Sequence, residues 1–176
     1  MSALSSRMLA FAPLIVLLAA GAIFSFAVMH GTPTRPSALV GRVAPPLTLQ
    51  ALDGVTAPEL TAKDLVGGTT VVNFWASWCA PCRLEHNTLM TLSLRKDLTL
   101  VGIAYKDDAA EARSFLEHLG NPFSRIGLDP QGRTAFDWGV SAVPETFVIG
   151  PDGRILAHTE GPLTDDAIKR LGLAPK

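Results

Sequence analysis

The sequence predicts a mixed α/β domain, with one β-sheet flanked by helices, preceded by an N-terminal transmembrane helix. Three observations carry this prediction. Apolar, β-branched runs alternate with helical patterns along most of the chain, the last two runs flank a tight-turn motif, and an uncharged apolar segment lies near the N-terminus. Strands that alternate with helices pair in parallel, whereas a terminal hairpin is antiparallel, so the sheet is expected to be mixed.

The apolar segment Met8–Met29 contains 22 residues and no charge. As a helix it would extend about 33 Å, enough to cross a hydrocarbon core of about 30 Å. A cleaved signal peptide has an apolar run of only about 7–15 residues before a small-residue site. Here the run continues beyond Ala20–Ala22. We therefore expect an uncleaved anchor at residues 8–29, preceded by a short N-terminal segment at 1–7, although the flanking basic residues do not set the orientation.

Residues 30–46 are rich in Pro and Gly, lack periodicity and are expected to form a linker to a domain at 47–176. The alternation in Leu47–Leu52, followed by Asp-Gly, predicts that this domain starts with a hairpin.

Strands and helices then alternate. Runs rich in β-branched and aromatic residues predict further strands, the first of them central and the last two a hairpin around Gly-Pro-Asp-Gly: Thr69–Ala76, Leu98–Tyr105, Ile126–Asp129 and the two halves of Glu145–Gly161. Apolar residues at three- to four-residue spacing and helix-end signals predict the helices: Pro81–Leu94, Ala109–Gly120, Arg133–Trp138 and Thr164–Leu171. Asp107 or Asp108 is the expected N-cap of the second helix.

Composition excludes several classes of protein. Hydrophobic residues make up 48% of the chain and charged residues 18%, which is compatible with a globular core plus an apolar segment. The formal net charge of −1 offers no basic footprint for nucleic acid. Two cysteines are too few for a disulfide framework that holds a small secreted protein together. Stability is therefore expected to come from a hydrophobic core.

The two cysteines, Cys79 and Cys82, form a C-x-x-C pair with several possible uses. Haem attachment requires a histidine directly after the pair, and Arg83 stands there instead. A structural zinc ion needs four ligands, whereas the pair and His86 supply three at most. Copper binding would lack a neighbouring methionine or histidine cluster. No metal or other cofactor is therefore expected.

A redox role fits the position of the pair better than that of two inert buried thiols. Cys79 lies where a strand ends and a helix begins, and a helix N-terminus stabilises a thiolate. Cys82 follows one turn later, within reach of the first sulfur. Pro81 is tolerated in the first helical turn. This arrangement predicts an exposed attacking thiol and a partly buried resolving thiol, as dithiol–disulfide exchange requires.

Two segments resemble landmarks of the thioredoxin-fold proteins: VVNFWASWCAPC, which ends at Cys82, and SAVPETFVI, which starts at Ser141. The resemblance implies a thioredoxin-like fold in which the Val143–Pro144 peptide is cis and faces the C-x-x-C pair. It also implies that the Val143 backbone, with Pro144 and Trp78, binds a substrate strand.

With the N-terminal anchor, the motifs YKDD, LGNPF, WGV and PETF narrow the resemblance to the CcmG/DsbE family, over roughly residues 40–170. This family resemblance implies a single-pass protein of the bacterial inner membrane, with a cytoplasmic N-terminus at residues 1–7 and its domain in the periplasm. The implied activity is reduction of the disulfide of apocytochrome c, or of a partner in cytochrome c maturation, with electrons from a membrane thiol transporter of the DsbD or CcdA type. The alternatives are a general periplasmic reductase or oxidase, and a tethered binding protein or metallochaperone without turnover.

Acidic residues near the thiols decide how protons move. Thioredoxins commonly have a buried carboxylate in the strand before the pair, and Asn73 stands there in this chain. Glu145 and Glu85 are the candidate replacements. Glu85, on a helix, is expected to be a solvated surface charge, whereas Glu145, beside the expected cis proline, is the candidate catalytic acid. Its charge would disfavour the Cys79 thiolate, so Glu145→Gln is predicted to lower the pKa of that thiol.

Overall fold

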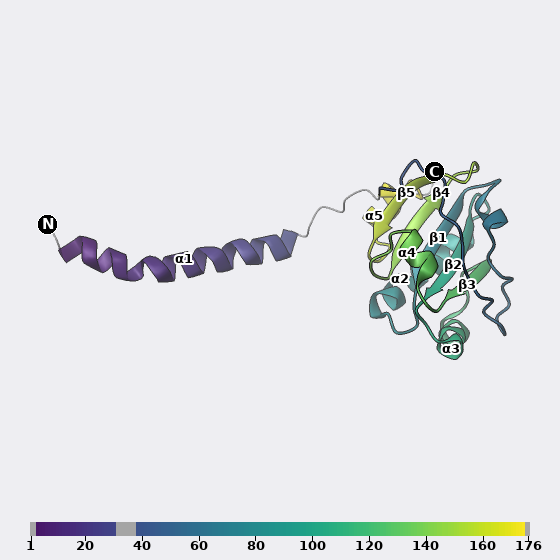
Figure 1. Ribbon diagram of the computed structural model, residues 1–176, viewed down its shortest axis with the longest axis horizontal. Helices are drawn as coiled ribbons and strands as arrows, with labels where there is room; N and C mark the ends of the chain where they lie inside the picture. The colour runs from purple at the N-terminus through teal and green to yellow at the C-terminus, as the bar shows by residue number, and fades with distance from the viewer. Residues whose placement is uncertain (1–2, 31–37, 175–176) are drawn as a thin grey trace. The chain divides into compact units, whose positions relative to one another are not determined.

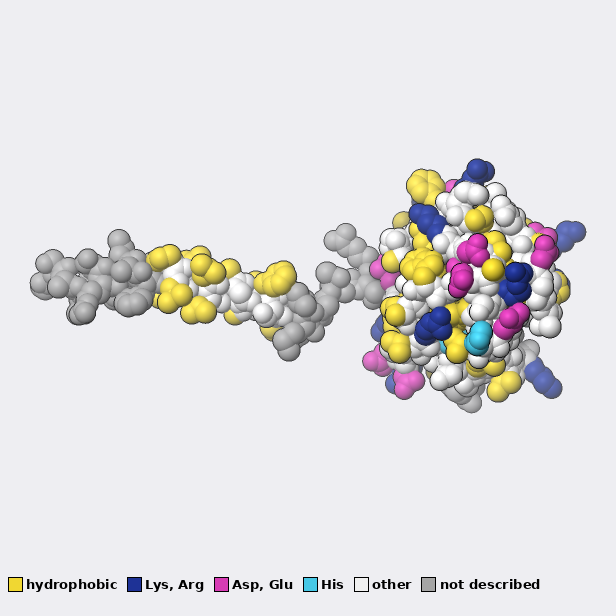
Figure 2. Space-filling view, turned by 90° about the horizontal axis from the view of Figure 1, so that it is seen from below, with side chains coloured by type: hydrophobic (Ala, Val, Ile, Leu, Met, Phe, Trp, Pro, Cys, Tyr) yellow, Lys and Arg dark blue, Asp and Glu magenta, His cyan; other side chains and the backbone are white. Residues whose placement is uncertain are grey.

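The computed structural model describes residues 3–30 and 38–174, with side chains described only at 13–26 in its first helix. The chain divides into two compact units, Met1–Arg35 and Pro36–Lys176. The first unit contains helix α1 (Ala3–His30), whose described side chains are exposed and mostly apolar (Figure 2). Over the residues that the structure describes, no helix is long and apolar enough to span a membrane. The anchor at 8–29 stays a prediction.

The second unit is built on a five-stranded sheet in the order β3-β2-β1-β4-β5 (Figure 1). Its first three strands are mutually parallel, β4 pairs with β1 in the antiparallel direction, and β4 and β5 form an antiparallel hairpin. The strand bounds are β1 (Thr70–Trp75), β2 (Thr99–Tyr105), β3 (Arg125–Asp129), β4 (Glu145–Ile149) and β5 (Ile155–Glu160). The predictions of a mixed sheet, of a central strand near Thr69–Ala76 and of a terminal hairpin are confirmed.

Helices cover both faces of the sheet, as predicted. One face packs against α2 (Ala80–Ser93), α3 (Ala109–Leu119) and α5 (Asp165–Arg170). The other packs against α4 (Arg133–Asp137) and the 3-10 helix η1 (Ala62–Leu65). Side chains alternate between two apolar clusters along each strand, so Trp75 lies in the α2-side core and Phe74 in the α4-side core. Figure 2 shows acidic and basic side chains interspersed on the face that it presents.

The predicted N-terminal hairpin does not form. Leu47–Leu52 instead runs along the outer edge of β3, where the Gln50 and Leu128 backbones exchange two hydrogen bonds of 2.8 Å. An exposed edge strand offers unpaired backbone groups, and this segment covers them, so its alternation reflects edge packing rather than a hairpin partner. The domain also begins earlier than expected, because Gly41 N donates to Ile155 O at 2.8 Å.

Gly102 in β2 makes room for the aromatic pair of Phe123 and Trp75. A Cβ atom at this position would lie 2.7 Å from Phe123, whose ring stacks on Trp75 with centroids 5.7 Å apart. Gly102→Ala is therefore expected to destabilise the domain by about 2 kcal/mol through overpacking and to lower Tm by about 5 °C. Gly68→Ala is the control, since nothing lies within 4 Å of its Cβ position. Equal thermal unfolding of the two variants would contradict this account of the core.

Candidate active site

Cys79 and Cys82 form a disulfide at the N-terminus of α2. Cys79 is the N-cap of the helix, and its Sγ accepts a hydrogen bond from the Cys82 N–H at 3.1 Å. That amide is one of the unpaired donors at a helix start, so the site can stabilise negative charge on the first sulfur, as predicted. Both cysteines are nearly buried, at 3% and 2% exposure. The expected exposure of Cys79 is therefore wrong for this disulfide form, because the loop before β4 covers it.

The covering loop contains the cis peptide Val143–Pro144, as the resemblance implied. Cys79 Sγ lies 3.5 Å from Val143 O, so the loop faces the disulfide directly. Trp78 is the exposed neighbour of the pair, with 61% of its surface accessible, and its indole N–H donates to Lys106 O at 3.1 Å. The tertiary structure thus brings the Val143–Pro144 peptide to Cys79, which Trp78 precedes in the chain.

Glu145 is buried, but its carboxylate binds the loop before β4 rather than lying beside the cysteine sulfurs. Oε1 accepts from the backbone N–H groups of Ser141 (2.8 Å) and Ala142 (3.2 Å), and Oε2 lies 2.8 Å from His158 Nε2. Glu145 and Phe74 are register partners whose side chains point to the α4 side of the sheet. The predicted neighbour of the cysteines is therefore a support of the loop that carries Val143.

Removing this support is expected to destabilise the domain. Glu145→Ala leaves two backbone donors and the His158 ring without their partner in a buried site, which should cost about 3 kcal/mol. Glu160→Ala is the control, because Glu160 pairs with Glu145 in the register of β4 and β5 but is exposed. Urea unfolding measures both variants, and equal midpoints would show that the Glu145 bonds add nothing to stability.

Glu85 lies on the buried face of α2, contrary to the prediction of a solvated charge. Only 1% of it is exposed. Its Oε1 accepts from Asn73 Nδ2 at 2.9 Å, and its Oε2 accepts from Leu163 N at 2.8 Å. The sequence placed Glu85 on a helix, but the sheet and the Leu163 loop that enclose it are distant in sequence. Hence no local signal marked its burial.

Burial raises the pKa of Glu85 from 4.5 to about 7, and the hydrogen bonds from Asn73 and Leu163 oppose this rise. Glu85 follows Cys82 by one helical turn, so the two side chains are neighbours on the buried face of α2. A carboxyl that titrates near neutral pH can accept and release a proton during thiol exchange. The site therefore has a titratable acid although Asn73 replaces the strand carboxylate, because Asn73 binds Glu85 of α2.

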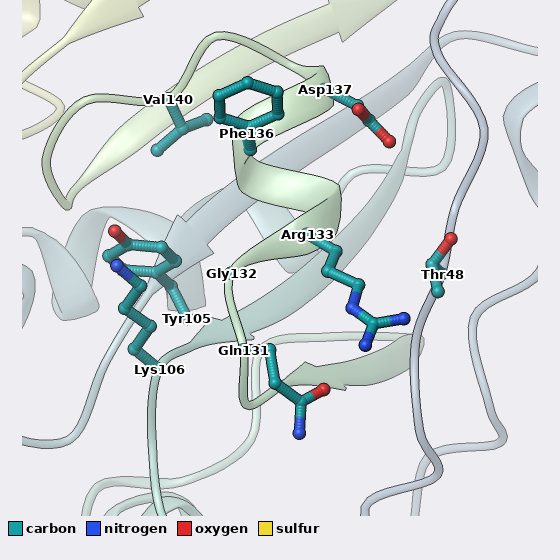
Figure 3. A pocket seen from close by; sticks show the side chains of 9 residues that line it. All are labelled: Thr48, Tyr105, Lys106, Gln131, Gly132, Arg133, Phe136, Asp137 and Val140. Atoms are coloured by element: carbon teal, nitrogen blue, oxygen red, sulfur yellow. The ribbon is translucent and has the colours of Figure 1, made fainter.

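Two clefts open beside the segment after β2. The first, of about 520 Å³, is shown in Figure 3, with Lys106 beside the Tyr105 ring and Arg133 directed toward Thr48. The second, of about 530 Å³, includes Trp78 and Arg83, whose guanidinium lies 4.8 Å from the Phe115 centroid. Ser77, Trp78 and Arg83, which flank the cysteine pair in the chain, line this second cleft.

His86, the third possible metal ligand in the sequence, binds a backbone carbonyl instead. Its Nε2 lies 3.0 Å from Gly120 O, and burial lowers its pKa below the usual value. Within the described part of the chain, no three His, Cys, Asp or Glu side chains are grouped as a metal site.

Comparisons with known proteins agree with this site. The Redoxin family matches residues 39–171. Thiol:disulfide interchange protein HelX of Rhodobacter capsulatus is 42% identical over 167 residues, which cover 94% of this chain and 93% of that protein. The DsbE homologue of Paracoccus denitrificans is 49% identical over 129 residues, covering 73% of this chain and 70% of that protein.

Solved structures share the fold. A Chlorobium tepidum structure assigned to thiol:disulfide interchange protein DsbE is 26% identical with a TM-score of 0.57, covering 71% of this chain and 87% of that one. A secreted disulfide oxidoreductase of Mycobacterium tuberculosis, at 22% identity, has a TM-score of 0.61 and covers 73% of this chain and 96% of that one. With the redox pair at the start of α2 and the cis proline opposite, the chain belongs to the CcmG/DsbE family of thioredoxin-fold thiol:disulfide interchange proteins.

Proposed function

We propose that this thiol:disulfide oxidoreductase reduces the C-x-x-C-H disulfide of apocytochrome c, or of a partner that carries its thiols, so that haem can be attached. The observation that carries the chemistry is the Cys79–Cys82 pair at a helix N-terminus, with the Val143 carbonyl 3.5 Å from Cys79 Sγ. The client class is supported by the family and by the motifs that carry the resemblance, PETF above all. Trp78, Val143 and Pro144 would contact the client strand.

The proposed reaction moves two electrons from protein to client. The Cys79 thiolate attacks one client sulfur, which breaks the client disulfide and forms a mixed disulfide. Cys82 then loses its proton to the Glu85 carboxylate and attacks Cys79 Sγ. The client leaves as a dithiol, after its departing thiolate is protonated, and the protein keeps the disulfide seen here. Electrons that reduce this disulfide again would come from a membrane thiol transporter of the DsbD or CcdA type.

The proposed location is the periplasmic side of a bacterial inner membrane, with residues 8–29 as an uncleaved anchor. It is supported by the 22 uncharged residues of Met8–Met29 and by the chemistry, because a C-x-x-C pair that cycles on client disulfides fits an oxidising compartment. Reporter fusions before and after the segment test the orientation. If a reporter that works only in the cytoplasm is active at both ends of the segment, the proposed topology is wrong.

The client assignment is tested with the reduced protein and two oxidised peptides. One carries C-x-x-C-H, and the other carries the same residues with the histidine moved away from the pair. We expect the first to be reduced at least about tenfold faster, since enzymes that distinguish substrates do so through kcat/KM. Equal rates for both peptides and for insulin would favour the general reductase. A reduction potential near about −120 mV, the value of a strong oxidant, would contradict a reductant altogether.

The non-turnover binding protein is tested separately. A double variant with Cys79→Ser and Cys82→Ser keeps the fold and the loop but cannot exchange electrons. If cells that carry only this variant still mature cytochrome c, binding rather than reduction is the function.

A further inference from the structure

His158 is a buried titratable side chain that the exchange reaction does not use. It lies in β5, only 5% of its side chain is exposed, and its ring stacks on Phe147 with centroids 4.2 Å apart. Its Nε2 lies 2.8 Å from Glu145 Oε2. Burying an imidazole costs hydration unless its polar atoms find partners. Phe147 therefore holds the face of this ring, and Nε2 is directed at one carboxylate oxygen.

The pairing of β4 with β5 sets this geometry. Phe147 is the register partner of His158, and Glu145 lies two residues earlier on the same face of β4. A side chain in an antiparallel pair contacts its direct partner and its diagonal neighbour. His158 makes both contacts, one through its ring face and one through Nε2. The orientation of the Glu145 carboxylate is thus set by a residue of the neighbouring strand.

The other oxygen of Glu145 binds the loop that faces the disulfide. Oε1 accepts from Ser141 N at 2.8 Å and from Ala142 N at 3.2 Å. A glutamate side chain has several rotatable bonds, so bonds at one oxygen alone leave the carboxylate free to turn. The contact with His158 at the second oxygen removes this freedom. Both loop amides therefore depend on His158 for a fixed acceptor.

The two bonded amides immediately precede Val143. Val143 O lies 3.5 Å from Cys79 Sγ, and the proposed function places the client strand on the Val143 backbone. A displacement of about 1 Å near reacting groups can lower a rate about 100-fold. The contacts therefore form a chain that runs from His158 through Glu145 to the backbone that meets the client.

We infer that His158 is a positioning residue for client binding, which holds the Val143 backbone in place through Glu145. The inference rests on the proposed exchange with a client strand at Val143 and not on the identity of the client. It leaves the redox couple unchanged, because the His158 ring stacks on Phe147 of the α4-side core, whereas both sulfurs lie in the α2-side core. The expected effect is thus confined to substrates that have a peptide backbone.

The test compares two disulfide substrates of the reduced full-length protein in single-turnover oxidation. Insulin offers a strand to the loop, whereas hydroxyethyl disulfide has no peptide backbone. In His158→Leu the side chain still packs on Phe147 but gives Glu145 no N–H. We expect the half-saturating concentration of insulin to rise about tenfold with little change in the maximal rate, because the loop contact contributes uniform binding. The rate with hydroxyethyl disulfide should stay within about twofold of the parent protein.

His158→Gln tests whether the bond to Glu145 is the cause. A glutamine amide can donate from nearly the same place as Nε2, so half-saturation by insulin should return to within about threefold of the parent protein. Hydrogen exchange of the Ser141 and Ala142 N–H groups, followed by NMR, needs no substrate. It should be about tenfold faster in His158→Leu and near the parent rate in His158→Gln.

Ile149→Val is the matched control for a general loss of stability. It removes one methyl group from the same core at the far end of β4, where Ile149 pairs with Thr70. Both disulfides should react with this variant within about twofold of the parent rates, because distant sites act independently. His158→Asn, whose amide is one bond too short to reach Glu145, replaces His158→Leu if the latter does not fold.

Unchanged half-saturation by insulin in the folded His158→Leu protein would overturn the inference. An equal loss with hydroxyethyl disulfide, or the same selective loss in Ile149→Val, would do so too, because either shows a general effect of stability. A His158→Gln protein as impaired as His158→Leu would exclude the bond to Glu145 as the cause.

The inference and the proposed client fail in different experiments. Equal reduction of the two C-x-x-C peptides contradicts the proposed client, but the comparison of His158 variants on insulin still stands. If the parent protein reduces neither insulin nor the peptides, the proposed function is wrong. Exchange of the Ser141 and Ala142 amides at the parent rate in His158→Leu would then still refute the hold of His158 on the loop.

Discussion

Replacing Cys82 with Ser is expected to stop turnover and to leave the client joined to Cys79 through a mixed disulfide. Cys82 is bonded to Cys79 in the structure and starts the same helix, so it is the nucleophile placed to release a client. A serine hydroxyl stays protonated near neutral pH and forms no bond that displaces sulfur. The attack of Cys79 on the client disulfide therefore still occurs, whereas the attack of residue 82 on the mixed disulfide is lost. Steady-state reduction should fall by at least about 1,000-fold.

The trapped complex is read by mass spectrometry under non-reducing conditions, and it disappears on addition of a thiol. Cys79→Ser is the matched control, since it removes the sulfur that lies beside Val143 O and leaves the nearly buried Cys82. It is expected to lose activity to a similar extent and to trap no client. Efficient trapping on Cys82 in that variant would reverse the assignment of the two cysteines.

Glu85→Gln is expected to slow release of the client and to remove a pH dependence near neutrality. Because burial raises the pKa of Glu85 to about 7, much of it is ionised at pH 7.5 and can take the proton of Cys82. Glutamine accepts no proton. In single-turnover experiments the decay of the mixed disulfide should slow about 100-fold at pH 7.5. The rise of this rate with pH, centred near 7 in the parent protein, should be lost.

The same substitution changes how stability depends on pH. A carboxyl whose pKa is higher in the folded protein than the usual 4.5 binds its proton more tightly there. Its contribution is fully present below pH 4.5 and is lost as pH rises through 7. The shift corresponds to about 3 kcal/mol of unfolding free energy. The oxidised parent protein should lose this amount between pH 4.5 and 8, and Glu85→Gln should not.

Glutamine also has only one acceptor for the two donors, Asn73 and Leu163, that bind Glu85. A constant loss of about 1 kcal/mol at all pH values is therefore expected in addition. Glu117→Gln, at an exposed position of α3, controls for the change of charge and should alter neither profile. A parent protein whose stability is flat from pH 4.5 to 8 would contradict the titration assigned to Glu85.

Regular elements were predictable because their signals are local. The β-branched run before the cysteines became β1, and the Gly-Pro-Asp-Gly turn joined β4 to β5. The Leu47–Leu52 hairpin was mispredicted because alternation marks a half-buried extended segment without naming its partner. That partner was β3, about 80 residues away in the chain.

By itself the sequence determined the redox pair and its position at a strand-to-helix junction, because N-caps, turns and apolar periodicity depend on neighbouring residues. Only the tertiary structure decided which acids serve that pair. Glu85 and Glu145 exchanged their expected places, since sheet alternation turns Glu145 toward His158 while Asn73 and Leu163 enclose Glu85. Likewise Asp108 caps α3 whereas Asp107 binds Ser77, although the two are adjacent in the chain. Burial and charge at a site depend on residues that folding brings from distant positions, and no local pattern records them.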